Sequence, residues 1–213
     1  GEGELASGLH GEGRMAEPGE IVSFIESYLR AGQPLEGKRI LITAGPTHEA
    51  IDPVRYIGNH STGKMGFALA AAAVDLGASV TLVTGPTHLD AAPPIRLIRV
   101  ISALEMYTQA VNAFPEADVV IGAAAVADYR PVKQEKEKLK KEGESLELRL
   151  VRNPDIIAAL GEQKTTQYVV GFALETRNEL QYAKEKLREK NLDAIVLNSL
   201  KDAGAGFGSD TNK

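Results

Sequence analysis

Cysteine and tryptophan are both absent from this chain of 213 residues, and only 5% of its residues are aromatic. Without cysteine the protein has no disulfide, no thiolate nucleophile and no Cys-ligated zinc, which fits a cytoplasmic location. The scarcity of aromatic rings argues against a surface on which nucleic-acid bases stack. A formal net charge of −5 also disfavours a polyanion, so we expect no nucleic-acid partner.

Long apolar runs are missing as well. The longest run, Phe67–Val74, is far shorter than the roughly 20 residues that a membrane-spanning helix needs. The first residues lack the charged-then-apolar layout of a signal peptide. We therefore expect no membrane contact. The Gly-rich beginning and the closing "GFGSDTNK" suggest cuts through a longer protein.

What the sequence does contain is an alternation of short β-rich apolar runs and helical patterns. Strands buried on both faces of a parallel sheet are continuously apolar, and strands separated by helices imply right-handed crossovers. The pattern predicts an α/β protein with a Rossmann-like open, mostly parallel sheet and helices on both faces. The predicted strands are 38–45, 79–86, 95–101, 118–128, 146–153, 168–175 and 193–199, and the predicted helices are 63–78, 102–114, 153–162 and 178–190.

Two segments lie outside this alternation. Residues 1–19 predict an extended arm, and residues 20–30 predict a helix with one apolar face, followed by a linker. Residues 130–145, "RPVKQEKEKLKKEGES", are strongly charged. A solvated loop is the usual structure of such a run, and a mobile Lys-rich flap that brings lysine to a bound anion is the other interpretation. The residues alone favour the loop.

The connection after the first predicted strand is unusually long, and it contains "GNHSTGKM" at residues 58–65. This stretch matches a Walker A loop except at Met65, where that motif has Ser or Thr. A P-loop also follows its strand directly, whereas here the strand ends near Gly45. The dinucleotide fingerprint G-x-G-x-x-G is absent at this place. We reject both interpretations. The missing fingerprint also disfavours a nicotinamide-dependent reductase.

Polar and small residues nevertheless gather where this connection enters the next helix. Asn59, Ser61, Gly63 and Gly66 lie at a helix N-terminus, which favours phosphate or carboxylate. Capping of the helix by Asn59 or Ser61 explains the same residues equally well. Elsewhere, Asp128 could bind a metal–triphosphate complex, although a turn residue is the favoured interpretation. The lysines Lys138, Lys186 and Lys190 read locally as exposed surface.

Several motifs occur in order along the chain. They are "TAGPTHEAIDPVRYIGNHSTGKMGFALA", "AAAVADYRP", "KLKK", "LVRNPDI", "VGFALET" and "KNLDAIVLN". Together they resemble bacterial phosphopantothenate–cysteine ligase, the C-terminal half of the bifunctional coenzyme A biosynthesis protein. The resemblance covers residues 37–213, which we expect to form the ligase domain. Residues 1–36 resemble the end of the preceding flavin-dependent decarboxylase domain.

The resemblance implies a two-step reaction. The carboxylate of 4′-phosphopantothenate attacks the α-phosphorus of CTP, giving an acyl-cytidylate and pyrophosphate, and the amine of L-cysteine then displaces CMP. It further implies Mg²⁺ or Mn²⁺ with the triphosphate, a homodimer with sites completed across the interface, and a cytoplasmic enzyme. A non-catalytic nucleotide-binding regulatory module is the alternative function.

The resemblance also implies roles for individual residues, and it reverses the local interpretation of Asp128 and the lysines. Asn59 and Lys138 are the expected catalytic residues. The expected substrate- and phosphate-binding residues are Gly45, Asn59, Ser61, Gly63, Gly66, Ala125 and Ala127. The expected nucleotide-binding residues are Asp128, which also meets the metal, Lys138, Asn153, Pro154, Asp155, Ile156, Phe172, Lys186, Lys190 and Asn198.

The sequence departs from the family pattern at both ends. Ser7 stands where the decarboxylase half commonly carries an active-site cysteine, so we expect neither bound flavin nor decarboxylase activity from this chain. Family members continue beyond "GFGSDTNK", so we expect the last part of the domain to be incomplete.

Overall fold

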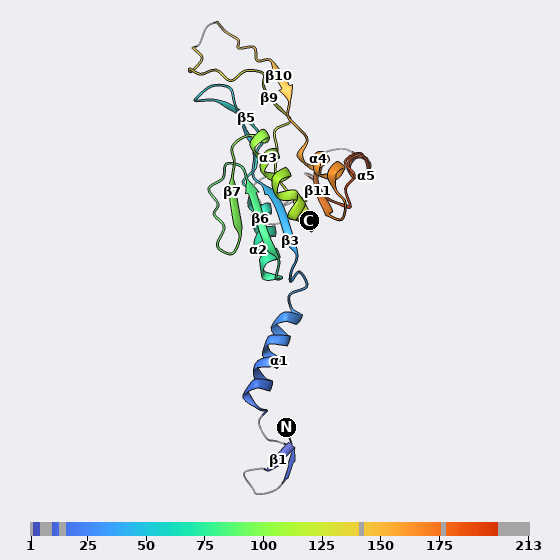
Figure 1. The fold of residues 1–213 in the computed structure, drawn as a ribbon. Coiled ribbons are helices and arrows are strands. Elements are labelled where there is room, and N and C mark those ends of the chain that lie inside the picture. Colours follow the sequence, from blue (N-terminus) through green and yellow to red (C-terminus); the bar gives the residue numbers. More distant parts are fainter. Residues whose placement is uncertain (1, 5–9, 13–15, 141–142, 176–177, 200–213) are drawn as a thin grey trace.

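A six-stranded sheet forms the centre of the computed structural model, which describes residues 2–4, 10–12, 16–140, 143–175 and 178–199. Every pairing within this sheet is parallel, as predicted. Ser7 and residues 200–213 lie outside the described residues. The strands are β3 (Arg39–Ala44), β6 (Ser79–Thr84), β7 (Arg96–Arg99), β8 (Val119–Gly122), β11 (Tyr168–Glu175) and β12 (Ala194–Ser199) (Figure 1).

The spatial order of these strands is β12-β11-β8-β3-β6-β7. The chain builds one half of the sheet outward from β3 and the other half outward from β8. Successive connections therefore diverge between β3 and β8, which is the topological switch point of a doubly wound fold. At such a point the loops after the two central strands separate and leave a crevice at their carboxyl ends.

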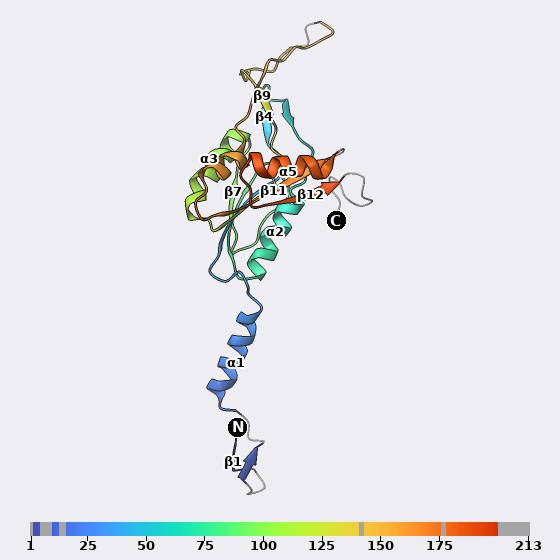
Figure 2. The ribbon, with the colours of Figure 1, turned by 90° about the vertical axis from the view of Figure 1, so that its right-hand side faces the viewer.

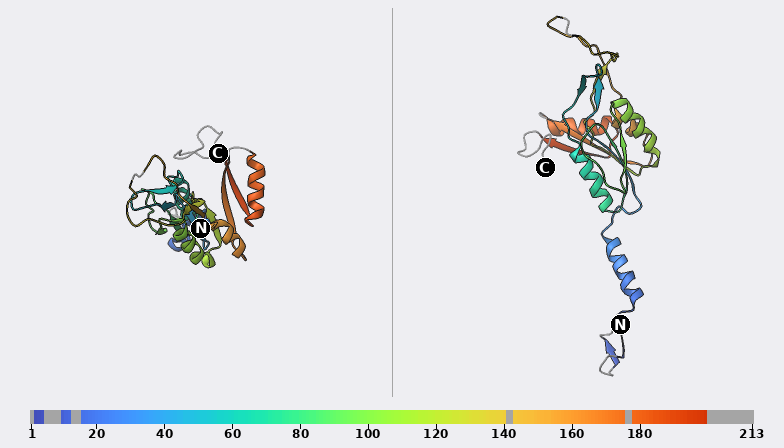
Figure 3. Two further views of the ribbon diagram at one scale, coloured as in Figure 1. Left: turned by 90° about the horizontal axis from the view of Figure 1, so that it is seen from above. Right: turned by 90° about the vertical axis from the view of Figure 1, so that its left-hand side faces the viewer.

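Helices cover both faces of the sheet. On one face α2 (Lys64–Asp75) packs Ala70 and Ala73 against a cluster with Ile42 and Leu82. On the other face α3 (Ala103–Ala113), η1 (Phe114–Glu116) and α4 (Ile156–Gln163) contribute to a cluster that includes Val120. Leu187 of α5 (Glu179–Glu189) packs against that second cluster. Seen from above, α5 lies beside β11 and β12 at one edge of the molecule (Figure 3).

Two hairpins project beyond the carboxyl ends of the strands. One pairs β4 (His48–Ala50) with β5 (Tyr56–Gly58), and the other pairs β9 (Tyr129–Pro131) with β10 (Leu150–Arg152). The prediction of a sheet strand at 146–153 is therefore wrong, because only Leu150–Arg152 is a strand and it pairs antiparallel outside the sheet. We call the segment between β9 and β10, residues 132–149, the arm.

The N-terminal elements extend from the opposite end of the molecule (Figure 2). β1 (Glu2–Glu4) pairs with β2 (His10–Glu12), and α1 (Pro18–Ala31) follows them. The predicted helix is confirmed, but its aromatic residues do not enter the core of the sheet. The rings of Phe24 and Tyr28 stack on each other with their centroids 6.4 Å apart, and both side chains remain exposed.

The helix ends show where local signals were sufficient. Ser102 and Glu105 form the capping box that their spacing suggests, and Gly77 follows α2 in the left-handed conformation, with φ 94°. The capping alternative is wrong. Neither Asn59 nor Ser61 caps α2, because the N-cap is Gly63 and no described side chain caps it. The predicted helix at 153–162 begins later than expected, since Asp155 is the N-cap of α4.

Candidate active site

The loops that follow β3 and β8 are joined to each other at the switch point. Ala125 donates its amide hydrogen to the carbonyl of Gly45, with an N–O distance of 2.8 Å. Farther out, the amide of Ala127 donates to Oγ1 of Thr47 at 3.0 Å, and Thr47 is fully buried. These bonds join two backbone segments that are distant in sequence, so the two loops lie side by side at the switch point.

The β3 loop approaches the N-terminus of α2 closely. Gly45 and Gly63 both have positive φ, 72° and 81°, and a Cβ added to Gly63 would lie 3.4 Å from the Cα of Gly45. Oγ of Ser61 accepts a hydrogen bond from the amide of Gly63 at 3.3 Å. One turn into the helix, a Cβ on Gly66 would lie 2.4 Å from that of Ala44. Small residues thus bring the helix N-terminus against the end of β3, and the positive end of the helix dipole there favours an anion.

Asn59 extends from this loop to the β8 loop. Its Nδ2 donates to the carbonyl of Val126 at 2.9 Å, and the residue is exposed. The structure therefore places Asn59 between the α2 N-terminus and the segment containing Ala125 and Ala127. This brings the predicted substrate- and phosphate-binding residues into one region.

A pocket of about 490 Å³ opens on the β8 side of the switch point. That volume is in the range of small-molecule sites. Its apolar wall includes Val126, Ile157 and Leu160, none of which the sequence singled out. Nine residues expected at the site do line it: Ala127, Asp128, Asn153, Pro154, Asp155, Ile156, Phe172, Lys186 and Lys190.

Several polar side chains in the pocket have defined partners. Nζ of Lys186 donates to the carbonyl of Phe172 at 2.7 Å. Nζ of Lys190 forms an ion pair with Oδ2 of Asp155 at 2.7 Å, while Oδ1 of Asp155 accepts from the amide of Ala158 at the start of α4. The Asp155 carboxylate offsets the charge of Lys190, and Lys186 is a second cation in the lining of the pocket.

Asn153 contacts the loop after β8 and the guanidinium of Arg130. Its Nδ2 donates to the carbonyl of Ala127 at 2.8 Å, and its backbone amide donates to the carbonyl of Asp128 at 2.8 Å. Its Oδ1 accepts from the guanidinium of Arg130 at 3.0 Å. Asn153 therefore fixes the segment after β10 to the β8 loop.

Sequence reasoning missed Arg152 and Tyr129, which face each other across β9 and β10 and line the pocket. A hydrogen bond with Tyr129 holds the pKa of the Arg152 guanidinium above its ordinary value. The available signal is its position, because Arg152 directly precedes the "NPD" stretch whose three residues are expected at the site. Arg152 adds a third cation to the lining.

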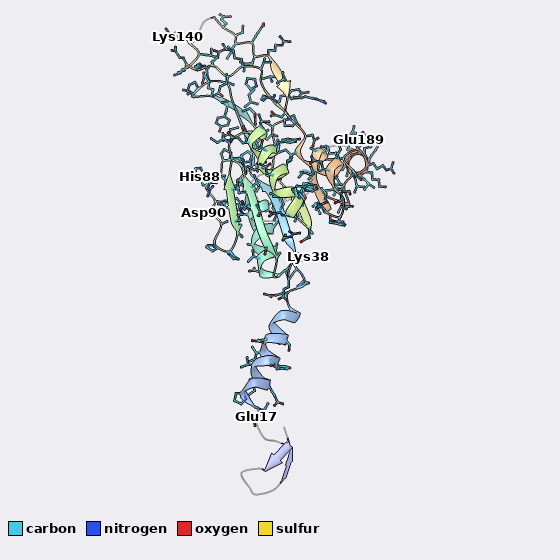
Figure 4. All side chains as sticks on the ribbon, in the orientation of Figure 1. Glu17, Lys38, His88, Asp90, Lys140 and Glu189 are labelled. Carbon is cyan, nitrogen blue, oxygen red and sulfur yellow. The ribbon has the colours of Figure 1, made fainter. Side chains whose placement is uncertain are left out.

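Two predicted nucleotide-binding residues do not line the pocket. Lys138 is exposed on the arm, whose far end is marked by Lys140 in Figure 4. Asn198 is half-buried on the edge strand β12. No group in the described part of the chain donates a hydrogen bond to its buried Oδ1.

A metal held by protein ligands alone does not fit the described residues, because they contain no group of three His, Cys, Asp or Glu able to hold an ion. Asp128 is an exposed carboxylate at the pocket. One carboxylate together with substrate phosphates and waters is a common way for proteins to bind Mg²⁺. The donor set thus fits a metal that arrives with a polyphosphate.

A doubly wound parallel sheet with a pocket at its switch point defines a Rossmann-like α/β class of protein. Within that class, the chain belongs to the family described as DNA/pantothenate metabolism flavoprotein C-terminal domain, whose model matches residues 35–213.

Three similar proteins illustrate the relationship. A cysteine/cysteine sulfinic acid decarboxylase from an unknown prokaryotic organism is 52% identical over 219 residues, covering 100% of this chain and 61% of the relative. The coenzyme A biosynthesis bifunctional protein CoaBC of Bacillus subtilis is 50% identical over 214 residues, covering 99% of this chain and 53% of the relative. The chain thus spans less than two thirds of the length of these curated relatives.

A crystal structure of the C-terminal domain of CoaBC is 47% identical, with a TM-score of 0.70, and the match covers 78% of this chain and 79% of that one. The likeness extends over most of both chains, and it agrees with the Rossmann-like architecture described above.

Proposed function

We propose that this chain is a CTP-dependent ligase that joins 4′-phosphopantothenate to L-cysteine through an acyl-cytidylate. The observation that carries the proposal is the pairing of a cation-lined pocket with the small-residue turn at the α2 N-terminus, linked by Asn59. The two subsites match a reaction that needs a nucleotide and a second, phosphorylated substrate. Membership of the family and the sequence identity of 50% to CoaBC of Bacillus subtilis and 47% to the C-terminal domain of CoaBC support the same function.

The pocket residues would bind and activate the nucleotide. Lys186, Lys190 and Arg152 would neutralise the triphosphate, and the apolar wall with Phe172 would hold the base. Attack of the substrate carboxylate on the α-phosphorus then expels pyrophosphate. Mg²⁺ or Mn²⁺ bound with the triphosphate at Asp128 would supply Lewis-acid charge neutralisation.

The loop residues would act on the other substrate. Ser61, Gly63 and Gly66 would bind the phosphate of phosphopantothenate at the α2 N-terminus, with Gly45 allowing the close approach. The Asn59 amide would donate to the acyl oxygen as negative charge develops during attack by the cysteine amine. Lys138 would contact the anionic intermediate and help exclude water. We also propose that Asn198 contributes to nucleotide binding.

A homodimer is part of the proposal. Apolar side chains are exposed on both projecting hairpins, which extend beyond the carboxyl ends of the strands. Contiguous exposed apolar surface favours association with another protein surface, and a second copy would complete the sites. The exposed residues are Val54, Tyr56, Val132, Leu146, Leu148, Leu150 and Val151.

The cellular setting proposed from the family is the cytoplasm. No helix in the described part of the chain has the length and apolarity needed to cross a membrane. We propose that residues 1–36 are the end of a decarboxylase domain that precedes the ligase domain in a longer protein, that residues 37–213 are the ligase domain, and that this chain binds no flavin.

The test is a reconstituted assay in which CTP, phosphopantothenate and cysteine are each omitted in turn. The expected result is release of pyrophosphate that requires CTP and phosphopantothenate, and formation of the amide and CMP that also requires cysteine. Binding of CTP without any product, unaffected by Asn59→Ala, would instead support a non-catalytic nucleotide-binding module.

A further inference from the structure

The turn between β4 and β5 contains a carboxylate with an unusually complete set of donors. Asp52 is only 2% exposed. Its Oδ1 accepts from the amides of Val54 and Arg55, both at 2.8 Å. Its Oδ2 accepts from Nε of Arg55 at 3.0 Å and from the amide of Leu139 at 3.1 Å, as well as from Nη2 of Arg55. The last of the amide partners is 87 residues away in sequence.

The same turn holds the arm at further points. Nη2 of Arg55 donates to the carbonyl of Leu139 at 2.9 Å, so both backbone groups of Leu139 are bound. The amide of Glu135 donates to the carbonyl of Ile51 at 2.9 Å. We call Asp52, Arg55 and Leu139 the clasp. It joins the part of the arm that follows β9 to the β4–β5 hairpin, which ends at Gly58.

The charges of Asp52 and Arg55 both oppose release of Leu139 from the clasp. The Arg55 guanidinium, aided by the bound amides, holds the pKa of the Asp52 carboxyl far below its usual range, so the group stays charged. A buried carboxylate that loses a donor is costly. Release of Leu139 would remove one donor from Asp52 and one acceptor from Arg55, and this opposes detachment of the arm.

Two residues assigned to catalysis lie next to the clasp in sequence. Lys138 directly precedes Leu139, and Asn59 follows the last residue of the hairpin that starts the clasp. Resting on the ligase function proposed above, we propose that Asp52 is a positioning residue that sets the place of Lys138 relative to Asn59. It acts through Arg55 and Leu139 and need not contact substrate itself.

The experiment compares Asp52→Asn with Asp90→Asn in the full chain. Asp90 is a matched control, because it also pairs with an arginine, Arg99 at 3.0 Å, but is exposed and belongs to the β6–β7 loop. We expect Asp52→Asn to lower kcat by roughly 10- to 100-fold, since misplacement by about 1 Å costs this much. The KM for CTP should change less than twofold, and Asp90→Asn should match the wild type.

A double-mutant cycle with Lys138→Gln separates positioning from general damage. If Asp52 acts through Lys138, the double variant should be no slower than the slower single variant. The proposal would be overturned if the loss of kcat in the double variant equalled the product of the losses in the two single variants. It would also be overturned if the Asp52→Asn enzyme were as active as wild type.

Hydrogen exchange on the wild-type protein provides a measurement that needs neither a stable variant nor activity. The amides of Glu135 and Leu139 should be protected at least about tenfold relative to unstructured peptide. Unprotected exchange in the wild type would overturn the clasp. Absence of CTP-dependent product from the wild type would refute the ligase function, and the exchange result would still judge the clasp.

Discussion

Replacement of Asn59 distinguishes a structural role from a catalytic one, because the two roles predict losses of different size in stability and in kcat. The side chain is exposed, and within the described residues it makes one hydrogen bond, from Nδ2 to the carbonyl of Val126 at 2.9 Å. Loss of such a bond costs about 0.5–1.5 kcal/mol of stability, which in a domain of this size lowers Tm by roughly 1–6 °C. Asn59→Ala and Asn59→Asp should therefore stay folded.

The catalytic effect should be larger. A donor to a developing oxyanion is worth about 100- to 1,000-fold in kcat, or roughly 2.7–4 kcal/mol. The structural hydrogen bond alone, even if fully expressed in the transition state, accounts for about tenfold. Asn59→Asp is the sharper change, because it replaces the donor with a carboxylate of the same shape.

The assay follows pyrophosphate and CMP separately. For Asn59→Asp we expect pyrophosphate release near the wild-type rate in a single turnover, slow CMP release after cysteine is added, and accumulation of acyl-cytidylate. If pyrophosphate and CMP release fall in parallel and no intermediate is trapped, the role assigned to Asn59 is mistaken. A Tm lowered by more than about 10 °C would instead mark the residue as structural.

Other changes test separate parts of the molecule. Lys138→Gln should slow turnover by roughly 10- to 100-fold, because a charge-assisted hydrogen bond is worth about 1.5–3 kcal/mol; unchanged turnover would return the arm to a solvated loop. Gly66→Ala places a Cβ 2.4 Å from that of Ala44 and should lower stability by about 1–3 kcal/mol, whereas Gly19→Ala, with nothing within 4 Å, should not; equal melting curves would contradict the close packing. Burial lowers the pKa of His48, so the unfolded chain takes up this proton first and stability should fall as pH drops below about 6.5. Melts of His48→Gln should lack that part of the slope, and an identical pH profile would count against it.

Local signals in the sequence predicted much of the fold. The apolar runs identified the strands of the sheet, and the helix predicted at 102–114 corresponds to α3. The run at 146–153 was misassigned, because an alternating ladder in a projecting hairpin has the same period as one in a sheet. Periodicity identifies a strand but not its partner.

The site was predictable only in part for a similar reason. Motif resemblance grouped the pocket residues, yet the contacts that arrange the site join distant segments. Asn59 meets Val126 across 67 residues, and Asp52 meets Leu139 across 87. From the local sequence, Asn59 could be a helix cap, because nothing near it shows that its side-chain amide donates to the carbonyl of Val126. Asp52 carried no signal, because its burial follows from the arm that packs over it.

The divergence of the chain at β3 and β8 has an evolutionary consequence. Apart from Thr43, every described residue that lines the pocket follows residue 121, whereas the turn at the α2 N-terminus precedes residue 67. Substitutions after residue 121 can therefore alter the proposed nucleotide subsite while the turn proposed for the other substrate is inherited unchanged. Recombination near the exposed Glu116, between α3 and β8, would exchange one proposed subsite and keep the other.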